Sequence, residues 1–246
     1  MTQTFEVATP LGPGRWHLDP AENPRANLLL GHGAGGGVTA MDLALLAAEL
    51  PQRGIGVLRY EQPWRLAGRK VATPPPQLDT GWRAGVQGLA DRGVLDAPLL
   101  FGGRSAGARV ACRTAVDDGT AGPDRRVIGI VCLAFPLHLP GRPDKSRAAE
   151  LLAPTVPRLV LQGTRDTFGT AEEIRAVAAV DPAVVLVELP GADHGYRTPK
   201  AAPFTPADLR DRLVQSLFAF VEALTGDAQD DGPPASGSRP RSRGPE

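Results

Sequence analysis

Ser105 is the only serine before residue 146, and it stands in Gly103-Arg104-Ser105-Ala106-Gly107 directly after the apolar residues 97–101. A Gly-x-Ser-x-Gly pattern after a strand is typical of a sharp strand-to-helix turn, in which the serine takes a strained backbone conformation. Small residues on either side let neighbouring chain pass close to such a turn. The hydroxyl is then exposed above the edge of the sheet, where it can act as a nucleophile. A chain with 29 glycines also produces this pattern by chance, so further residues have to support it.

A serine hydroxyl becomes a good nucleophile only when a base accepts its proton, and four histidines compete for that role. His194 follows the last predicted strand in a flexible, glycine-flanked loop, from which it can swing over a nucleophile at a neighbouring strand end. His138, in a proline-rich loop after another strand, is the second choice. We expect His32, in a glycine-rich turn, to hold that turn by hydrogen bonds and so to belong to the oxyanion and substrate-binding site. We expect His17 to lie on the surface of an edge strand.

Asp166 is the candidate for the carboxylate that fixes the tautomer of the imidazole and stabilises its cation. It follows the predicted strand 158–162, although an aspartate there would also suit a turn or a helix cap. Ser105, Asp166 and His194 each follow a strand, in the order serine, aspartate, histidine. This order predicts a triad for nucleophilic attack on an acyl carbon.

The glycine-rich turn at residues 31–37 offers backbone N–H groups to the negative charge that develops on a carbonyl oxygen during acyl transfer. We assign one donor to the N–H of Ala106, directly after the nucleophile. We assign the other to Ala34, with Gly35 as its nearest competitor.

The same turn matches a second pattern. Gly31, Gly33 and Gly36 spell the Gly-x-Gly-x-x-Gly of dinucleotide sites, and Glu61 ends the next predicted strand, where a ribose-binding acid would lie. Dinucleotide binding is therefore an alternative function. Two observations count against dinucleotide binding. The next predicted helix starts near Thr39 rather than at the glycines, and this function would leave the candidate triad unexplained.

These residues need elements to position them, and apolar runs alternate with helical patterns along the chain. The alternation predicts an α/β fold with a mostly parallel central sheet and helices on both faces. Residues 5–9 and 15–19 flank a Gly-Pro-Gly turn, which predicts an N-terminal antiparallel hairpin at one sheet edge. The other predicted strands are residues 27–30, 55–60, 99–102, 127–134, 158–162 and 184–189.

Helical patterns cover residues 41–50, 105–116 and 171–180, and a last helix starts at Pro206. We expect Thr39 to cap the first of these, with Asp42 completing a partial capping box. The last helix has the clearest pattern, with Thr205 as its cap. Its apolar stripe belongs against the sheet and consists of Leu209, Leu213, Leu217, Val221 and Leu224.

Length, charge and composition narrow the functional classes. The 246 residues can bury one sizeable core, which we expect to be a single domain over residues 1–225. Residues 226–246 contain almost no apolar side chain and are expected to be a disordered tail. Lys plus Arg and Asp plus Glu are each 27, so no net field favours nucleic acid or an anionic membrane. Without a signal segment or a run long enough to span a bilayer, the sequence predicts a cytoplasmic protein.

Cys112 and Cys132 lie in apolar contexts and are expected to be two buried thiols. No Cys-x-x-Cys pair or cysteine–histidine cluster in the sequence suggests a metal site.

Together these motifs resemble the α/β-hydrolases, more narrowly the dienelactone-hydrolase-like enzymes and the hydrolase-like proteins of the testis-expressed and histone-acetyltransferase-complex-associated group. The resemblance covers roughly residues 24–224. It is carried by His32-Gly33-Ala34-Gly35, Gly102-Gly103-Arg104-Ser105-Ala106-Gly107-Ala108-Arg109, Phe135-Pro136-Leu137-His138, Gln162-Gly163-Thr164-Arg165-Asp166-Thr167-Phe168-Gly169 and Asp193-His194. It implies an α/β-hydrolase fold and a Ser/Asp/His hydrolase without metal or organic cofactor. The dienelactone hydrolases have a cysteine nucleophile where this chain has Ser105, so their substrate is not implied.

The sequence therefore predicts a serine hydrolase that acts on a carboxylic ester or similar small-molecule acyl substrate through an acyl-enzyme. About 20 residues separate Phe135 from the strand at residue 158, which leaves no room for a large lid and favours small acyl groups. The alternative from another class is a noncatalytic α/β-hydrolase-like subunit that binds a protein partner. Either protein would be a monomer or a homodimer.

Several cations suggest an acidic acyl substrate as a further hypothesis. Arg104 adjoins the nucleophile and is a candidate substrate-binding residue, and Arg65, Arg69 and Lys70 lie in the predicted loop 61–80. Solvated loop cations are the simpler interpretation.

Overall fold

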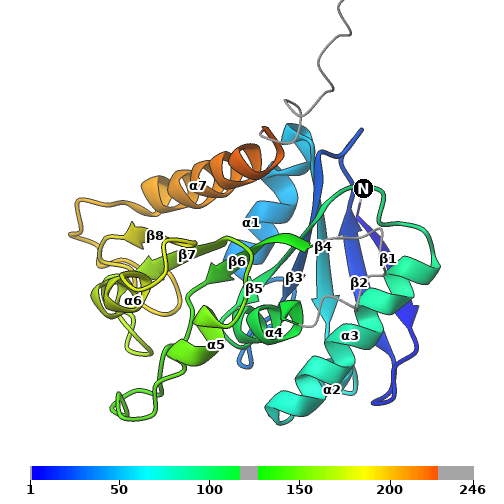
Figure 1. The fold of residues 1–246 in the computed structure, drawn as a ribbon, viewed down its shortest axis with the longest axis horizontal. Coiled ribbons are helices and arrows are strands. Elements are labelled where there is room, and N and C mark those ends of the chain that lie inside the picture. The colour runs from blue at the N-terminus through cyan, green and yellow to red at the C-terminus, as the bar shows by residue number, and fades with distance from the viewer. Residues whose placement is uncertain (1, 117–126, 227–246) are drawn as a thin grey trace, which may run out of the picture.

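The computed structural model describes residues 2–116 and 127–226, and that part of the chain contains one eight-stranded sheet (Figure 1). Its strand order is β1-β2-β4-β3-β5-β6-β7-β8. β1 and β2 form an antiparallel hairpin, β2 pairs antiparallel with β4, and the remaining pairs are parallel. The strands are β1 (Gln3–Val7), β2 (Gly14–Asp19), β3 (Ala26–Gly31), β4 (Ile55–Glu61), β5 (Leu99–Arg104), β6 (Val127–Leu133), β7 (Arg158–Gly163) and β8 (Val184–Leu189). The predicted fold class and hairpin are confirmed.

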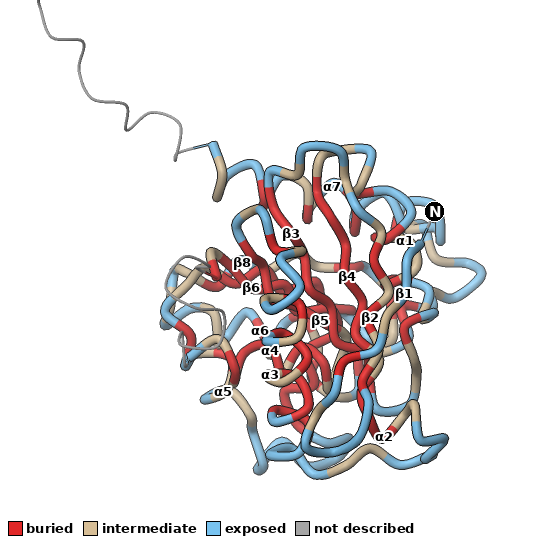
Figure 2. Tube along the Cα trace, turned by 90° about the vertical axis from the view of Figure 1, so that its right-hand side faces the viewer, coloured by how far each residue is buried: buried red, intermediate tan, exposed pale blue. Residues whose placement is uncertain are grey.

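Helices cover both faces of this sheet, as predicted. The helices are α1 (Met41–Glu49), α2 (Pro63–Leu66), α3 (Pro75–Asp91), α4 (Ala106–Ala115), α5 (Ala148–Leu152), α6 (Ala171–Ala178) and α7 (Pro206–Gly226), with a short 3-10 turn, η1 (Pro51–Arg53). α1 and α7 pack on one face, and α3, α4, α5 and α6 pack on the other (Figure 1). The five strands β3 to β7 are buried along most of their length (Figure 2). Two apolar layers result, one on each side of the sheet.

The last helix has the predicted cap and the predicted buried stripe. The backbone N–H of Asp208 donates to Thr205 Oγ1 at 3.2 Å, and the Thr205 N–H donates to Asp208 Oδ2 at 2.8 Å. The stripe lies in the core beside α1 and the strands, with Leu209, Leu213, Leu217 and Val221 buried and Leu224 half-buried. Burial of this stripe anchors α7 to the sheet.

The start of the first helix differs from the prediction. α1 is preceded by Ala40, and no side chain caps it, so the predicted cap by Thr39 is wrong. Asp42, expected to complete a capping box, is instead 1% exposed and lies 2.5 Å from Nη1 of Arg104. The Asp42 carboxylate therefore pairs with Arg104, which is distant in the sequence, and does not cap the start of α1.

The segment after β4 also differs, because residues 61–80 are not a simple loop. α2 lies within it and α3 begins within it. The prolines before and at the start of α3 suit a first helical turn. Glycines inside this helix allow a close approach to the sheet, since a Cβ on Gly85 would lie 2.7 Å from Cζ of Tyr60 and one on Gly88 would lie 2.6 Å from Cγ1 of Val7. α3 was not predicted from the sequence, because these glycines and prolines lower helix propensity.

Residues 134–157, all of them described, connect β6 to β7 with α5 as their helix, so no large lid is present there. Cys112 and Cys132 are buried free thiols, as predicted, with their Sγ atoms 3.6 Å apart. None of the helices in the described ranges combines the length and apolar character needed to cross a membrane. The predicted tail, residues 226–246, lies outside the described residues except for Gly226, which ends α7.

Candidate active site

Ser105 lies between β5 and α4 with φ 52° and ψ −110°. A positive φ is unfavourable for a residue with a Cβ, so the strained turn expected from the sequence is present. The neighbouring glycines make room for it. A Cβ on Gly103 would lie 2.5 Å from the carbonyl oxygen of Gly31, and one on Gly107 would collide with the Gly31 backbone.

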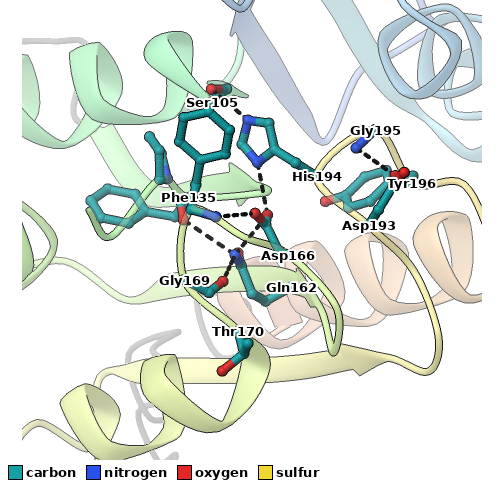
Figure 3. A network of polar contacts seen from close by, with 12 residues as sticks. Ser105, Phe135, Gln162, Asp166, Gly169, Thr170, Asp193, His194, Gly195 and Tyr196 are labelled. Atoms are coloured by element: carbon teal, nitrogen blue, oxygen red, sulfur yellow. Dashed lines mark hydrogen bonds and ion pairs between the residues drawn. The ribbon is translucent and has the colours of Figure 1, made fainter. Parts of the chain in front are cut away.

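The structure brings Ser105, His194 and Asp166 into one hydrogen-bonded row (Figure 3). Ser105 Oγ lies 3.0 Å from Nε2 of His194, and Nδ1 of His194 lies 2.8 Å from Oδ2 of Asp166. The three residues follow β5, β8 and β7, whose carboxyl ends meet at the same edge of the sheet. Asp166 is fully buried and can only accept when ionised, so Nδ1 carries the proton and Nε2 is left to accept from the serine hydroxyl.

Asp166 is itself held by two further donors. Its Oδ1 accepts from the backbone N–H of Phe168 at 2.8 Å, and its Oδ2 accepts from Nε2 of Gln162 at 3.0 Å. Gln162 is fully buried at the end of β7 and also donates to the Gly169 carbonyl at 2.6 Å (Figure 3). The role of Gln162 in holding Asp166 was not predicted from the sequence. A polar residue near the end of an otherwise apolar strand was the signal that could have indicated it.

Several hydrogen bonds hold the loop that carries His194. The side chain of Asp193 accepts from the N–H groups of Gly195 at 2.7 Å and of Arg197 at 2.9 Å. Tyr196, with φ 58°, donates its hydroxyl to the Leu161 carbonyl at 2.7 Å. These bonds hold the loop in a conformation that places the imidazole beside Ser105.

Arg104 was predicted to bind substrate, but its guanidinium is occupied within the protein. Nη1 contacts Asp42, Nη2 donates to the His194 carbonyl, and the guanidinium carbon lies 5.0 Å from the centroid of the Tyr196 ring. Burial disfavours its charged form, but the Asp42 carboxylate more than offsets this and raises the pKa of Arg104 above its ordinary value. The prediction that Arg104 contacts substrate is therefore corrected: its guanidinium binds Asp42 and the His194 backbone instead.

His32 holds the glycine-rich turn, as expected. Its Nδ1 lies 2.9 Å from the Gly33 carbonyl, and its Nε2 accepts from the backbone N–H of Gln62 at 3.2 Å. Burial lowers the pKa of His32, so the ring is neutral and Nδ1–H donates to Gly33. His32 is therefore a structural residue of the turn.

His138, the second choice for the base, lies elsewhere. Its Nδ1 lies 2.8 Å from the Leu139 carbonyl, and its Nε2 lies 3.0 Å from Oε1 of Glu173 in α6. Both ring nitrogens are engaged away from Ser105. The hydrogen bond to the Leu139 carbonyl, together with the Glu173 carboxylate, raises the pKa of His138.

The structure opposes the alternative of dinucleotide binding. Oε2 of Glu61 lies 3.5 Å from Nε2 of His17 and 3.8 Å from Nη1 of Arg15, so it faces the N-terminal hairpin. The side chain of His17 is 19% exposed, which makes it half-buried rather than a surface residue. α1 begins only at Met41, so the glycine turn is not the start of a helix that could bind a pyrophosphate.

A small cavity lies beside Ala106, the residue that follows Ser105. It has a volume of about 10 Å³ and is walled mainly by apolar side chains from α2, α3 and α4. Ala34 and Ala106, which we expected to supply the two oxyanion donors, both line it, whereas Gly35 does not. The lining residues are Gly31, His32, Ala34, Gln62, Trp64, Ala72, Leu78, Trp82, Ala106, Gly107 and Val110.

The cations that suggested an acidic substrate do not line this cavity. Arg69 and Lys70 are exposed, and Arg65 is half-buried. With Arg104 bound to Asp42, the cavity wall presents no cationic side chain from the described residues. This wall suits a neutral acyl group.

Comparison with known proteins agrees with this architecture. Residues 24–222 match a family model described as an alpha/beta hydrolase domain. The chain is similar to an alpha-beta serine hydrolase homologue from Coxiella burnetii, with 18% identity and a TM-score of 0.68 over 88% of this chain and 98% of that one. It is also similar to a serine hydrolase without lid from Xanthomonas campestris, with 18% identity and a TM-score of 0.62 over 94% and 97%. A third similar structure is esterase 2 of Thermogutta terrifontis phosphorylated by paraoxon, with 15% identity and a TM-score of 0.65 over 90% and 94%.

Proposed function

Because the chain belongs to the alpha/beta hydrolase domain family, we propose that it is a serine hydrolase that cleaves esters, or similar acyl compounds, of short acyl groups. The observation that carries the proposal is the row in which Ser105 Oγ lies 3.0 Å from His194 and His194 lies 2.8 Å from Asp166. The similar structures from Coxiella burnetii and Xanthomonas campestris are described as serine hydrolases, which supports the same class of activity.

In the first half of the proposed reaction, Ser105 Oγ attacks the ester carbonyl carbon while Nε2 of His194 takes the hydroxyl proton. Asp166 stabilises the imidazolium that forms. The carbonyl oxygen becomes negative and is bound by the backbone N–H groups of Ala106 and Ala34. The tetrahedral intermediate then collapses, the ester C–O bond breaks, and the leaving alkoxide takes the proton from Nε2.

In the second half, a water molecule attacks the acyl group on Ser105 and gives its proton to Nε2 of His194. Collapse of this intermediate releases a carboxylic acid and returns the proton to Oγ. Each half moves one proton through the same nitrogen, so the chain's own residues complete both halves of the cycle.

The cavity beside Ala34 and Ala106 supports the substrate class. Its volume of about 10 Å³ gives room for roughly one water-sized or methyl-sized group. Trp64, Leu78 and Trp82 are buried side chains of its wall and limit its depth. We therefore propose the acetyl group and similarly short acyl groups, since longer chains would have to leave the cavity.

Hydrolysis of p-nitrophenyl acetate tests this function. The native protein should release p-nitrophenol, and Ser105→Ala and His194→Ala should reduce the rate to background. Ser146→Ala is a matched control, because Ser146 is an exposed serine outside the candidate site. A folded native protein that hydrolyses no acyl ester would favour the alternative, a noncatalytic subunit that binds a protein partner.

The narrower likeness to dienelactone-hydrolase-like and testis-expressed hydrolase-like proteins is also part of the proposal. Two of the motifs that carry it pack together here, since a Cβ on Gly169 would lie 2.6 Å from Cβ of Leu137. We further propose a single domain over residues 1–225 and a cytoplasmic monomer or homodimer.

A further inference from the structure

One guanidinium connects three chain segments around the site. Arg104 immediately precedes Ser105, and its Nη1 lies 2.5 Å from Oδ2 of Asp42 in the first turn of α1. Its Nη2 donates to the backbone carbonyl of His194, and its guanidinium lies over the ring of Tyr196. The contacts thus link the serine turn, the helix after the glycine-rich turn, and the loop that carries the histidine.

This contact is buried on both sides. The side chain of Arg104 is 14% exposed and that of Asp42 is 1% exposed. Separating the two groups would leave the Asp42 carboxylate buried without a cation, which is strongly unfavourable. Arg104 and Asp42 are therefore expected to stay in contact. The planar guanidinium offers N–H donors in fixed directions, so Nη1 donates to the Asp42 carboxylate while Nη2 donates to the His194 carbonyl. A lysine ammonium lacks this planar set of donors and cannot reproduce both contacts in the same directions.

Charge balance gives the pair a second consequence. The proposed reaction forms an imidazolium on His194, and a lone cation at the carbonyl of that residue would disfavour it. Asp42 neutralises Arg104, so the arginine can hold the histidine loop without opposing the positive charge.

From these contacts we propose that Arg104, held by Asp42, is a positioning residue that sets the separation between Nε2 of His194 and Oγ of Ser105. The proposal rests on the proposed hydrolase function, and it assigns Arg104 a role in turnover rather than in substrate binding. A shift of about 1 Å in a reacting pair can cost on the order of 100-fold in rate.

The test compares Arg104→Met with Arg113→Met as a matched control. Arg113 lies on α4, and its side chain is 19% exposed. It forms ion pairs with Asp79 at 2.7 Å and with Glu150 at 2.9 Å, away from Ser105 and His194. With p-nitrophenyl acetate as substrate, we expect Arg104→Met to lower kcat by about 10- to 100-fold, with KM within about twofold of the native value. Arg113→Met should keep the native kcat.

Chemical rescue separates positioning from a general loss of structure. Guanidinium chloride, far below its unfolding concentrations, should restore part of kcat to Arg104→Ala and should leave Arg113→Ala unchanged. If Arg104→Met does not fold, Arg104→Lys and Asp42→Asn take its place, and both should lower kcat with little change in KM. A folded Arg104 variant with native kcat would overturn the inference, as would equal losses in the Arg113 control.

Labelling with a fluorophosphonate separates failure of this inference from failure of the proposed function. If the native protein is labelled and Arg104→Met is labelled at the same rate, the positioning role is wrong while the hydrolase function stands. If the native protein takes no label, the proposed function fails and the inference fails with it.

Discussion

The ring of Phe168 lies against the imidazole of His194, with the ring centroids 4.2 Å apart and the planes tilted by 30°. The backbone N–H of the same residue donates to Asp166. One residue therefore contacts both the proposed base and its carboxylate, and its side chain limits how far the imidazole can turn.

Replacing this ring should weaken turnover without unfolding the protein. Phe168→Leu keeps the backbone bond to Asp166 but removes the stacked ring. We expect kcat to fall by about 2- to 10-fold, the equivalent of one aromatic contact, whereas Phe168→Tyr should stay near the native kcat. Steady-state kinetics on p-nitrophenyl acetate measure this, and an unchanged kcat in Phe168→Leu would show that the ring has no role in placing His194.

Gln162→Leu should cost stability as well as rate. The substitution removes the donor to Asp166 and leaves the buried carbonyls of Phe135 and Gly169 without their side-chain donor. A loss of about 1–3 kcal/mol in the free energy of unfolding is expected, measured by urea titration. Native stability in this variant would mean that the amide does not hold the aspartate.

Gly107→Ala should destabilise the fold at the serine turn, because the added Cβ would collide with the Gly31 backbone. Overpacking of this kind costs about 1–3 kcal/mol. Gly36→Ala serves as the stability control, since a Cβ there would meet nothing within 4 Å. Equal unfolding midpoints for the two variants in urea would count against the close packing described for the turn.

His138 should make the stability of the protein depend on pH. Its folded pKa is raised above the unfolded value of about 6.5. The His138 contribution is therefore fully present below about pH 6.5 and is lost as the pH rises through the folded pKa. His138→Gln should destabilise the protein more at about pH 5.5 than at about pH 8.5. Urea titrations at both pH values measure this, and an equal loss at the two would contradict the ion pair with Glu173.

Acyl-chain length should be limited by Trp64. The native protein should prefer p-nitrophenyl acetate to p-nitrophenyl esters of longer acids, and Trp64→Leu should shift the optimum of kcat/KM toward longer chains by opening the cavity wall. A native enzyme that hydrolyses octanoate as well as acetate would show that the acyl group lies outside this cavity.

The sequence predicted the strands well because each is an apolar run bounded by turn residues, and the parallel order followed from the helices between them. The grouping of Ser105, Asp166 and His194 was also predictable, since the ends of parallel strands meet at one edge of a sheet. These features depend on local patterns and on a general rule of topology.

The missed features depend on contacts between distant residues. Asp42 and Arg104 are 62 positions apart, and nothing in their local sequences links them. The patterns therefore suggested a helix cap for one and a substrate contact for the other. α3 was missed because its glycines disfavour a helix in isolation, whereas in the folded protein they let that helix pack closely on Tyr60.

The central claim, an activated serine at position 105, is tested most directly by intact-mass analysis after reaction with a fluorophosphonate. We expect one adduct on the native protein and on Ser146→Ala, none on Ser105→Ala, and greatly slowed addition on His194→Ala. A folded native protein that takes no adduct, or an adduct that persists in Ser105→Ala, would contradict it.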